Sequence, residues 1–256
     1  MDRHVIKNST ALPWKSAWVT GASSGIGRDI AIKLAQRGVK VAASARSIER
    51  LEDLARAHAN IHAFPVDVTS RDQMGETAAR ILTAFGILDL AILNAGTWEP
   101  RRARDYDATA AARSMAVNYL GMANALEPLI PHMIERRDGQ LALVGSVAGY
   151  RGLPMASAYA PSKAAVISLA EVLRLELAPL GVTVSLVNPG FVNTPMTSVN
   201  AFPMPFLIES DDAAERIISG LIRGKFEIAF PLQLVVLLKI LRLLPNSLYL
   251  RIASRL

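Results

Sequence analysis

The amino-acid sequence predicts an α/β protein with a doubly wound, parallel sheet of seven strands flanked by helices on both faces. Short apolar runs recur along its 256 residues, segments with helical periodicity separate them, and a glycine-rich turn follows the first run. Because strand and helix alternate throughout, we expect right-handed crossovers between parallel strands. Ligands bind such sheets at the carboxyl ends of the strands, so the motifs that end the apolar runs are the candidates for a functional site.

Seven apolar runs are predicted as strands. The first six lack a clean alternation of apolar and polar residues, which is typical of parallel strands buried on both faces. The runs are SAWVT (16–20), KVAASA (40–45), IHAFPV (61–66), LDLAIL (88–93), QLALVG (140–145), TVSLVN (183–188) and FEIAFP (226–231). The first helix is predicted in IGRDIAIKLAQRG (26–38), where the apolar residues form helix faces and Gly38 ends the segment.

Length and composition indicate one domain. The chain is 51% apolar, which is enough for a large core, and a chain of this length commonly forms a single α/β unit. We expect a lead-in at 1–14, a main domain at 15–230 and an apolar, basic, helical extension at 231–256. The absence of cysteine excludes disulfides and thiol chemistry, and the start of the chain lacks the apolar core of a secretory signal, so we expect a cytoplasmic location.

The net charge of +6 is concentrated near the C-terminus. Four cations follow Pro231 with no acidic residue among them, which leaves only +2 for the rest of the chain. These cations are Lys239, Arg242, Arg251 and Arg255. A charge this small elsewhere, with no basic stripe, argues against nucleic acid as a partner.

A glycine-rich turn, TGASSGIG (20–27), follows the first predicted strand and opens onto the first helix. Gly21, Gly25 and Gly27 let the backbone turn tightly, approach a pyrophosphate and pack against the sheet, while N–H groups at the helix start attract the anion. The pattern GxxxGxG therefore predicts a dinucleotide site in a Rossmann-type domain. A glycine turn without any ligand is the alternative.

The same turn contains GASSG, which matches the GxSxG pattern of a hydrolase nucleophile elbow with Ser23 as the nucleophile. That mechanism needs a histidine late in the chain, but the four histidines are His4, His58, His62 and His132. A hydrolase is therefore disfavoured. His58 and His62 have helix spacing for a metal but lack an adjacent glutamate and a third ligand, so no metal site is expected.

The end of the second predicted strand indicates which dinucleotide binds. An NAD site has an acidic residue there, about 20 residues after the glycine turn, to bind the ribose hydroxyls. Here the sequence reads Ser44, Ala45, Arg46, with a guanidinium that can pair with a 2′-phosphate and no carboxylate to repel it. We expect NADP(H) in preference to NAD(H), the alternative being that Arg46 is only solvated.

A tyrosine and a lysine lie one helical turn apart in SAYAPSKAA. Tyr159 and Lys163 therefore project from one face of a helix predicted to run to about Leu180. Pro161 is tolerated in a first turn and Ser157 is predicted as the cap, which places the pair at the helix start. The ammonium and the positive helix end should lower the pKa of the phenol, so that Tyr159 can act as a general acid.

Two further polar residues complete a candidate site. Ser146 ends the fifth predicted strand, where its hydroxyl can hydrogen-bond the carbonyl that Tyr159 protonates, and Asn118 is the remaining polar group of a mostly apolar segment. Each residue also has a structural alternative. Ser146 could be a turn residue, Asn118 a helix kink or cap, and Lys163 a surface cation.

Seven short motifs, in order, resemble those of the short-chain dehydrogenase/reductase family between Lys15 and Thr197. They are TGASSGIG (20–27), DVT (67–69), LNAG (93–96), VN (117–118), GS (145–146), YAPSK (159–163) and NPGFVNT (188–194). Each motif alone is short, but together and in this order they identify the chain as a member of that family.

The resemblance implies a catalytic tetrad. Tyr159 would be the acid and base, Lys163 would bind the nicotinamide ribose, Ser146 would orient the carbonyl, and Asn118 would hold a water of the proton relay. It also implies that residues 67–68 meet adenine, 94–95 line a ribose and 189–194 cover the nicotinamide. The implied cofactor-binding residues are Gly21, Ser23, Ser24, Gly25, Ile26, Gly27, Arg46, Asp67, Val68, Asn94, Ala95, Gly96, Tyr159, Lys163, Pro189, Gly190, Val192 and Thr194.

The implied reaction is hydride transfer between NADP(H) and a carbonyl or secondary alcohol. A non-catalytic nucleotide-sensing or scaffold protein is the alternative, although such a protein has no need of the complete tetrad. The loop at 191–208 holds apolar residues and no cation, which favours an apolar substrate. These residues include Phe202, Met204, Pro205 and Phe206. The family also implies a homodimer or homotetramer joined through the long helices beside the fifth strand.

Two features depart from the family pattern. Gly145 stands where the family commonly has the first of two serines, and the tail at 231–256 replaces a glycine-rich ending. Residues 232–244 are apolar nearly all round until Pro245, but 13 residues are too few for a bilayer, which needs about 20. Three interpretations are open: packing against the domain or a sister subunit, peripheral docking on a membrane surface, or a lid over the substrate pocket.

Overall fold

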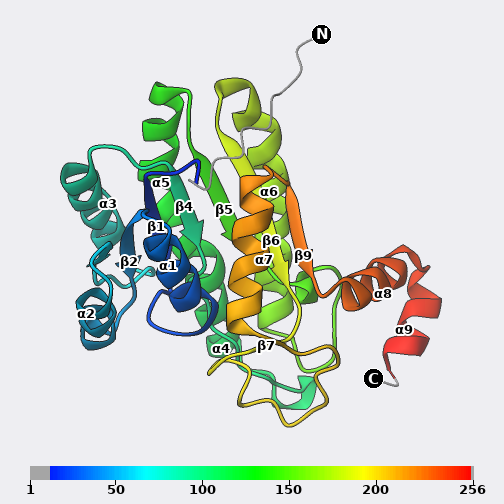
Figure 1. The fold of residues 1–256 in the computed structure, drawn as a ribbon. Coiled ribbons are helices and arrows are strands. Elements are labelled where there is room, and N and C mark those ends of the chain that lie inside the picture. Colours follow the sequence, from blue (N-terminus) through cyan, green and yellow to red (C-terminus); the bar gives the residue numbers. More distant parts are fainter. Residues whose placement is uncertain (1–11, 255–256) are drawn as a thin grey trace.

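The computed structural model describes residues 12–254, so most of the predicted lead-in and Arg255 lie outside the described residues. The main sheet has seven parallel strands in the order β3-β2-β1-β4-β5-β6-β9 (Figure 1). The strands are β1 (Ser16–Thr20), β2 (Lys40–Ser44), β3 (Ile61–Ala63), β4 (Leu90–Leu93), β5 (Gln140–Val144), β6 (Thr183–Pro189) and β9 (Glu227–Phe230). All seven predicted strands and their parallel arrangement are confirmed.

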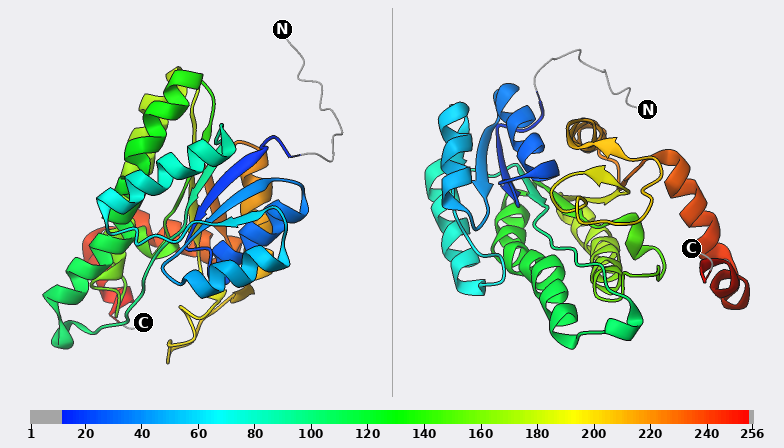
Figure 2. Two further views of the ribbon diagram at one scale, coloured as in Figure 1. Left: turned by 90° about the vertical axis from the view of Figure 1, so that its left-hand side faces the viewer. Right: turned by 90° about the horizontal axis from the view of Figure 1, so that it is seen from below.

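Helices cover both faces of this sheet (Figure 2, left). On one face lie α1 (Gly25–Gln36), α2 (Ile48–Ala57) and α7 (Ser210–Ile222). On the other lie α3 (Arg71–Phe85), α5 (Gly121–Arg136) and α6 (Tyr159–Leu177), while the short α4 (Ala108–Met115) packs beside α6. Such a three-layer arrangement buries both faces of the strands, which explains their continuous apolar runs.

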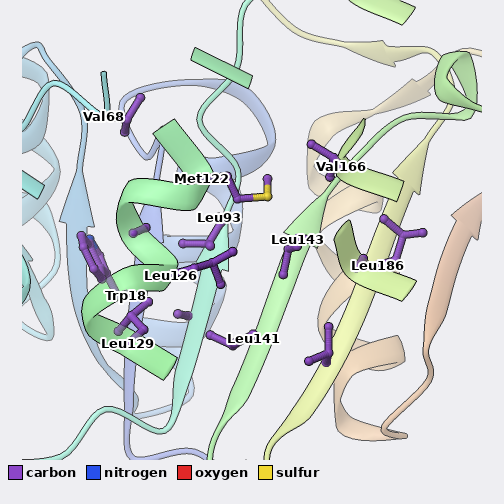
Figure 3. Close-up of a cluster of buried hydrophobic side chains, with 14 of the residues drawn as sticks. Trp18, Val68, Leu93, Met122, Leu126, Leu129, Leu141, Leu143, Val166 and Leu186 are labelled. Carbon is purple, nitrogen blue, oxygen red and sulfur yellow. The ribbon is translucent and has the colours of Figure 1, made fainter. Parts of the chain in front are cut away.

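Alternate residues of each central strand serve the two layers. In β4, Leu90 and Ile92 pack with α1 and α7, whereas Leu93 packs with α5 and α6. Figure 3 shows Leu93 and Leu141 of the sheet against Leu126 of α5. These side chains are almost fully buried, so their packing fixes where the carboxyl end of each strand lies. The polar residues that follow the strands are positioned by the same packing.

The strand order reverses between β1 and β4, because the chain returns to the middle of the sheet after β3. The connections that leave these two neighbouring strands run to opposite faces, and a crevice is expected between them at the carboxyl ends. The glycine turn at 20–27 begins where β1 ends. It therefore opens into this crevice.

Two very short strands and one helix end differ from the sequence-based expectation. The strands β7 (Val192–Asn193) and β8 (Ile208–Glu209) pair in parallel and were not predicted, because two residues carry no periodic pattern. Helix α6 ends at Leu177 and continues as a short 3-10 turn, Ala178–Leu180. Pro179 explains the change, since it has no N–H with which to continue the α-helical pattern.

Two helices follow β9, namely α8 (Leu232–Leu243) and α9 (Asn246–Ala253), with Pro245 between them. They extend away from the sheet beyond β9 (Figures 1 and 2). Leu234 and Val235 of α8 are buried in the same core as α5 and α6. Within residues 12–254 no helix has both the length and the apolar character needed to cross a membrane.

Candidate active site

A cavity of about 700 Å³ lies at the carboxyl ends of the strands and gathers most of the predicted site. The predicted residues that line it are Gly21, Ser23, Ser24, Gly25, Ile26, Arg46, Asp67, Val68, Asn94, Ala95, Gly96, Ser146, Tyr159, Lys163, Pro189, Gly190, Val192 and Thr194. Only Gly27 and Asn118 of the predicted set do not line it. Residues from six different loops thus meet in one space, as the strand order requires.

The glycine turn is held against the loop after β4. The hydroxyl oxygen of Thr20 accepts hydrogen bonds from the backbone N–H groups of Asn94 (3.0 Å) and Ala95 (3.1 Å). Gly21 has a φ of +69°, a left-handed conformation that favours glycine, and a Cβ there would lie 2.9 Å from the Cα of Ala95. The turn can therefore be built only with glycine at this position.

The cavity fits a dinucleotide at this turn. Gly21 and Gly25 line the cavity beside the start of α1, and a Cβ at Gly25 would come within 3.0 Å of Thr194. Helix α1 has no acidic residue in its first turn, so its N-terminal N–H groups and its dipole favour an anion. Ser23 and Ser24 add hydroxyl groups to the same wall.

Gly27 does not face the cavity, and its role is packing. A Cβ there would lie 2.4 Å from the carbonyl oxygen of Gly21 and 2.5 Å from Nδ2 of Asn94. We expect Gly27→Ala to lower the free energy of unfolding by about 1–3 kcal/mol, since overpacking of backbone against backbone has no room to relax. Urea unfolding measures the change.

A helical glycine elsewhere in the chain is the matched control for Gly27. Gly75 lies inside α3, and a Cβ there would meet no atom within 4 Å. Gly75→Ala should raise the free energy of unfolding by about 0.5–1 kcal/mol, because alanine loses less backbone entropy in a helix. Equal effects of the two substitutions would refute the packing role of Gly27.

The end of β2 places cations at one end of the cavity. The Ser44 side chain is fully buried and donates to the carbonyl oxygen of Phe64 (2.7 Å), so it does not reach a ligand. Arg46, Ser47 and Arg50 line the cavity instead. Arg50 was not predicted as a site residue. The sequence does contain a signal for it, because Arg50 lies one helical turn after Arg46 and so can lie beside it.

Asp67 is held beside this cation cluster. Its Oδ1 accepts hydrogen bonds from the backbone N–H (2.9 Å) and the hydroxyl (2.8 Å) of Thr69. These contacts, led by the Thr69 N–H, lower the pKa of Asp67, and the charge of Arg46 lowers it further. The carboxylate is therefore ionised at neutral pH and fixed in orientation.

Ser146, Tyr159 and Lys163 converge on the other end of the cavity. The hydroxyl of Ser146 accepts a hydrogen bond from the N–H of Ala148 (3.1 Å) and donates to the carbonyl oxygen of Pro189 (3.4 Å). The ammonium of Lys163 is almost fully buried, donates to the carbonyl oxygen of Val144 (2.8 Å) and lies 5.6 Å from the centre of the Tyr159 ring. Lys163 is therefore not a surface cation.

The expected cap of α6 was wrong. The helix begins at Tyr159 with Ala158 as its N-cap, and no side chain caps it, so Ser157 does not serve this role. The backbone of Ala158 is already helical, which leaves no extended residue from which a serine side chain could reach back. The placement of Tyr159 and Lys163 in the first turns is nevertheless as expected.

The lowered pKa expected for the tyrosine was also wrong. Burial raises the pKa of Tyr159 to about 12, and only the nearby Ser146 hydroxyl acts in the opposite direction. Burial lowers the pKa of Lys163 to about 8. The effect of burial on the pKa of Tyr159 outweighs the effect of the ammonium charge. Both groups are enclosed, and the Lys163 ammonium is directed at the carbonyl oxygen of Val144 rather than at the phenol.

Asn118 lies within a single π-helical turn, Ala116–Leu120, between α4 and α5. Its Oδ1 accepts from the N–H of Thr97 (2.7 Å), and its Nδ2 donates to the carbonyl oxygen of Thr97 (3.1 Å) and to the hydroxyl of Ser162 (2.9 Å). The side chain thus joins the loop after β4 to α6. Because its partners are protein groups, the amide is not directed into the cavity.

The departure at Gly145 has a steric cause. A Cβ at this position would lie 2.5 Å from Oδ1 of Asn188 and 3.2 Å from Cδ1 of Leu186. Asn188 is fully buried, and its Nδ2 donates to Oε1 of Glu227 (3.0 Å). A serine at 145 would have to displace this fixed side chain, whereas glycine leaves the backbone in place beside Ser146.

Trp98 is a residue near the candidate tyrosine that no motif indicated. Its ring meets the Tyr159 ring edge-on, with 5.0 Å between the centres. Its Nε1 donates to Oδ1 of Asn200 (2.8 Å) in the loop between β7 and β8. The contact joins segments 102 positions apart, so only the folded chain could reveal it. Arg113 of α4 also lines the cavity and likewise belongs to no motif.

Hydrolase and metal chemistry find no support at this site. No histidine of residues 12–254 lines the cavity, so Ser23 has no imidazole base there. Within the described part of the chain, no three His, Asp or Glu side chains gather in the way that a metal centre requires.

Comparisons with known proteins agree with this geometry. A family model described as short chain dehydrogenase matches residues 15–202. An uncharacterized oxidoreductase from Myxococcus xanthus is 39% identical over 249 residues, which cover 96% of this chain and 98% of that protein. An uncharacterized oxidoreductase from Staphylococcus aureus is 32% identical over 218 residues, which cover 84% of this chain and 94% of that protein.

Two solved structures are similar over most of the fold. A short chain dehydrogenase from Burkholderia cenocepacia in complex with NADP has a TM-score of 0.83 and 28% identity, covering 94% of this chain and 98% of that one. A short chain dehydrogenase/reductase from Burkholderia phymatum in complex with NAD has a TM-score of 0.81 and 25% identity, covering 88% and 92%. With the family match over 15–202 and the glycine turn, tyrosine and lysine in one cavity, the chain belongs to the short-chain dehydrogenase family of oxidoreductases.

Proposed function

We propose that the protein is an NADP(H)-dependent oxidoreductase that transfers a hydride between nicotinamide and an apolar carbonyl or secondary alcohol. One observation carries the proposal. A single cavity has Ser146, Tyr159 and Lys163 at one end and the glycine turn with Arg46 and Arg50 at the other. That arrangement provides a proton donor at one end and an anion-binding wall at the other, as a dinucleotide-dependent reductase requires.

Tyr159 is proposed as the proton donor to the substrate oxygen. The nicotinamide, when bound, supplies or accepts the hydride, and the protein supplies the proton. A pKa of about 12 keeps the Tyr159 hydroxyl protonated at neutral pH, which suits reduction of a carbonyl. Ser146 lines the same cavity, and its hydroxyl can hydrogen-bond the same substrate oxygen.

Lys163 is proposed to bind the ribose hydroxyls next to the nicotinamide. With a pKa of about 8 it is mostly protonated at neutral pH, and its positive charge favours the tyrosinate that remains after proton transfer. Asn118 is proposed to act through the backbone of its π turn, where a water of the proton relay would bind, since its side-chain amide is engaged by Thr97 and Ser162.

The proposed preference for NADP(H) rests on the cations at the end of β2. Arg46, Ser47 and Arg50 line the cavity, and none of the residues at the end of β2, Ser44, Ala45 and Arg46, is acidic. A guanidinium pairs with a phosphate in a bidentate manner, and two of them would bind the 2′-phosphate that NAD lacks. The similar structures in complex with NADP and with NAD support either nicotinamide cofactor, so the preference depends on these arginines.

The apolar substrate is proposed from the walls near Tyr159. Trp98 borders the ring of Tyr159, and Met196 lines the cavity. Trp98 and Met196 offer an apolar surface to the part of the substrate that does not react.

A homodimer or homotetramer is proposed through the helices on either side of β5. Val172 and Leu175 on α6 are large apolar residues with 46% and 77% of their surface exposed. Burying such residues against a second copy would be favourable.

A nucleotide-sensing or scaffold protein of the same fold is the second candidate. It would bind the dinucleotide without turnover. A panel of apolar ketones, aldehydes and secondary alcohols, assayed with NADPH, NADH, NADP⁺ and NAD⁺ by absorbance of the reduced nicotinamide, separates the two. Turnover of at least one substrate supports the proposal, whereas cofactor binding without turnover of any member would favour the sensor.

Removing the cations tests the cofactor preference. We expect Arg46→Ala/Arg50→Ala to lower kcat/KM with NADPH by about 10²-fold, because two charge-assisted contacts to the 2′-phosphate are lost. Activity with NADH should change little. Arg56→Ala, an exposed arginine of α2 outside the cavity, is the control and should leave both values unchanged. A double variant that keeps the full preference for NADPH would remove the basis of the proposal.

A further inference from the structure

Helix α8 has apolar side chains on two opposite faces, and the protein covers only one of them. Leu234 and Val235 are buried against the core beside α5 and α6. Four other residues follow at intervals of three or four and so form one exposed stripe, here called the α8 stripe. They are Leu232, Val236, Ile240 and Leu243, exposed by 70%, 46%, 55% and 84%. An exposed apolar stripe of this kind indicates a surface that binds a partner protein or a membrane.

The α8 stripe cannot fold back onto the protein, because the segment is fixed in place. The guanidinium of Arg151 donates to the carbonyl oxygens of Leu241 (2.7 Å) and Leu244 (2.8 Å) at the end of α8. It also lies 3.8 Å from the ring centre of Tyr249 in α9, whose hydroxyl donates to the carbonyl oxygen of Gly152. Both helices are therefore attached to the loop at residues 151–152. These contacts fix which face of each helix is covered by the protein.

Charge distinguishes this segment from the rest of the surface. Residues 231–256 contain four cations and no aspartate or glutamate. Lys239 forms an ion pair with Glu227 of β9. Arg242 and Arg251 are exposed, and no Asp or Glu side chain of residues 12–254 forms an ion pair with either of them. The exposed apolar stripe is thus accompanied by two cations that form no ion pair with an acidic side chain in the described part of the chain.

We propose that α8 and α9 dock the protein on the surface of an anionic lipid bilayer, with α8 parallel to the surface and the α8 stripe among the acyl chains. The 12 residues of α8 span only about 18 Å, too little for a hydrocarbon core of about 30 Å, which places the helix in the interface rather than across it. Arg242 and Arg251 would meet the lipid phosphates. This docking does not depend on the proposed reaction.

A second copy of the chain fits the α8 stripe less well than a bilayer. Each partner of a stable dimer buries about 800 Å², whereas a single stripe about 18 Å long on one helix is much smaller. Like charges on the two copies would also face each other, since the segment has cations and no acidic side chain. A bilayer containing anionic lipid satisfies both the apolar stripe and the cations.

Vesicle co-sedimentation of the full chain tests the proposal. Wild-type protein should bind vesicles of phosphatidylcholine and phosphatidylglycerol, and bind weakly to phosphatidylcholine alone or at high salt. Ile240→Gln/Leu243→Gln should lower the affinity for anionic vesicles by at least about tenfold. Arg242→Gln/Arg251→Gln should lower it by about thirtyfold, each cation near an anionic surface contributing to binding.

The control is Ile87→Gln/Ile222→Gln, which changes two other exposed apolar residues (49% and 46% exposed) outside α8 and α9. Its vesicle binding should equal that of the wild type. Absence of wild-type binding, or equal binding by the α8 stripe variant, overturns the proposal. The proposal is also overturned if light scattering shows that the wild type is a dimer, that Ile240→Gln/Leu243→Gln dissociates this dimer, and that the wild type does not bind vesicles. Since vesicle binding is measured without substrate, its failure is distinct from a failure of the proposed reaction.

Discussion

Tyr159→Phe should lower turnover by about 10³-fold or more while NADPH still binds. The substitution removes only the hydroxyl, and positioned general acids contribute about 10²–10⁴-fold to a rate. The phenylalanine ring keeps its edge-on contact with Trp98, so the cavity wall should not change. Stopped-flow turnover measures the loss, and the fluorescence of bound NADPH measures the cofactor affinity.

A second buried tyrosine controls for the loss of a phenol as such. Tyr150 is 7% exposed, its hydroxyl donates to Oε1 of Glu227 (2.5 Å), and it does not line the cavity. Tyr150→Phe should retain most of the activity, although it loses this hydrogen bond. If Tyr159→Phe and Tyr150→Phe were equally active, Tyr159 could not be the proton donor.

The sheet and the tyrosine–lysine pair could be predicted because both depend on local sequence. Parallel strands buried on both faces appear as apolar runs between turns, and all seven runs became strands. Tyr159 and Lys163 share a helix face through their spacing alone. The cavity then follows from strand order, since residues that end neighbouring strands must meet at one edge.

Features that depend on distant contacts could not be predicted. The raised pKa of Tyr159 results from its surroundings in the folded protein, so a motif does not reveal it. The amide of Asn118 is engaged by Thr97, 21 positions away. Helix α8 is apolar nearly all round, and its periodicity therefore could not indicate which face docks on the core and which remains exposed.

Lys163 should make the protein less stable at neutral pH. Burial lowers its pKa from 10.5 to about 8 in the folded state. Between these two pH values the unfolded chain binds more protons, so the free energy of unfolding rises with pH in that window. Below pH 8 the cost of the buried charge is fully present, and the pKa difference corresponds to about 3 kcal/mol. Near pH 10.5 the cost disappears.

Lys163→Met should therefore raise the free energy of unfolding at pH 7 by about 2 kcal/mol and abolish most of the turnover. The gain is smaller than the cost of the charge because the carbonyl oxygen of Val144 loses its hydrogen bond, which contributes about 1 kcal/mol. Urea unfolding at several pH values measures the difference between variant and wild type, which should shrink from pH 8 upwards. Comparing the two proteins cancels the contribution of Tyr159.

Lys225→Met is the control, because Lys225 is exposed at the turn before β9. It should change neither turnover nor the pH dependence of stability. A Lys163→Met variant that is less stable than the wild type at every pH would show that the ammonium stabilises the fold. Burial of the Lys163 charge would then not lower the free energy of unfolding, contrary to the prediction. A variant that gains stability but keeps full turnover would contradict the proposed role of Lys163. Only the combination of higher stability and lost turnover is expected of a buried charge that the reaction requires.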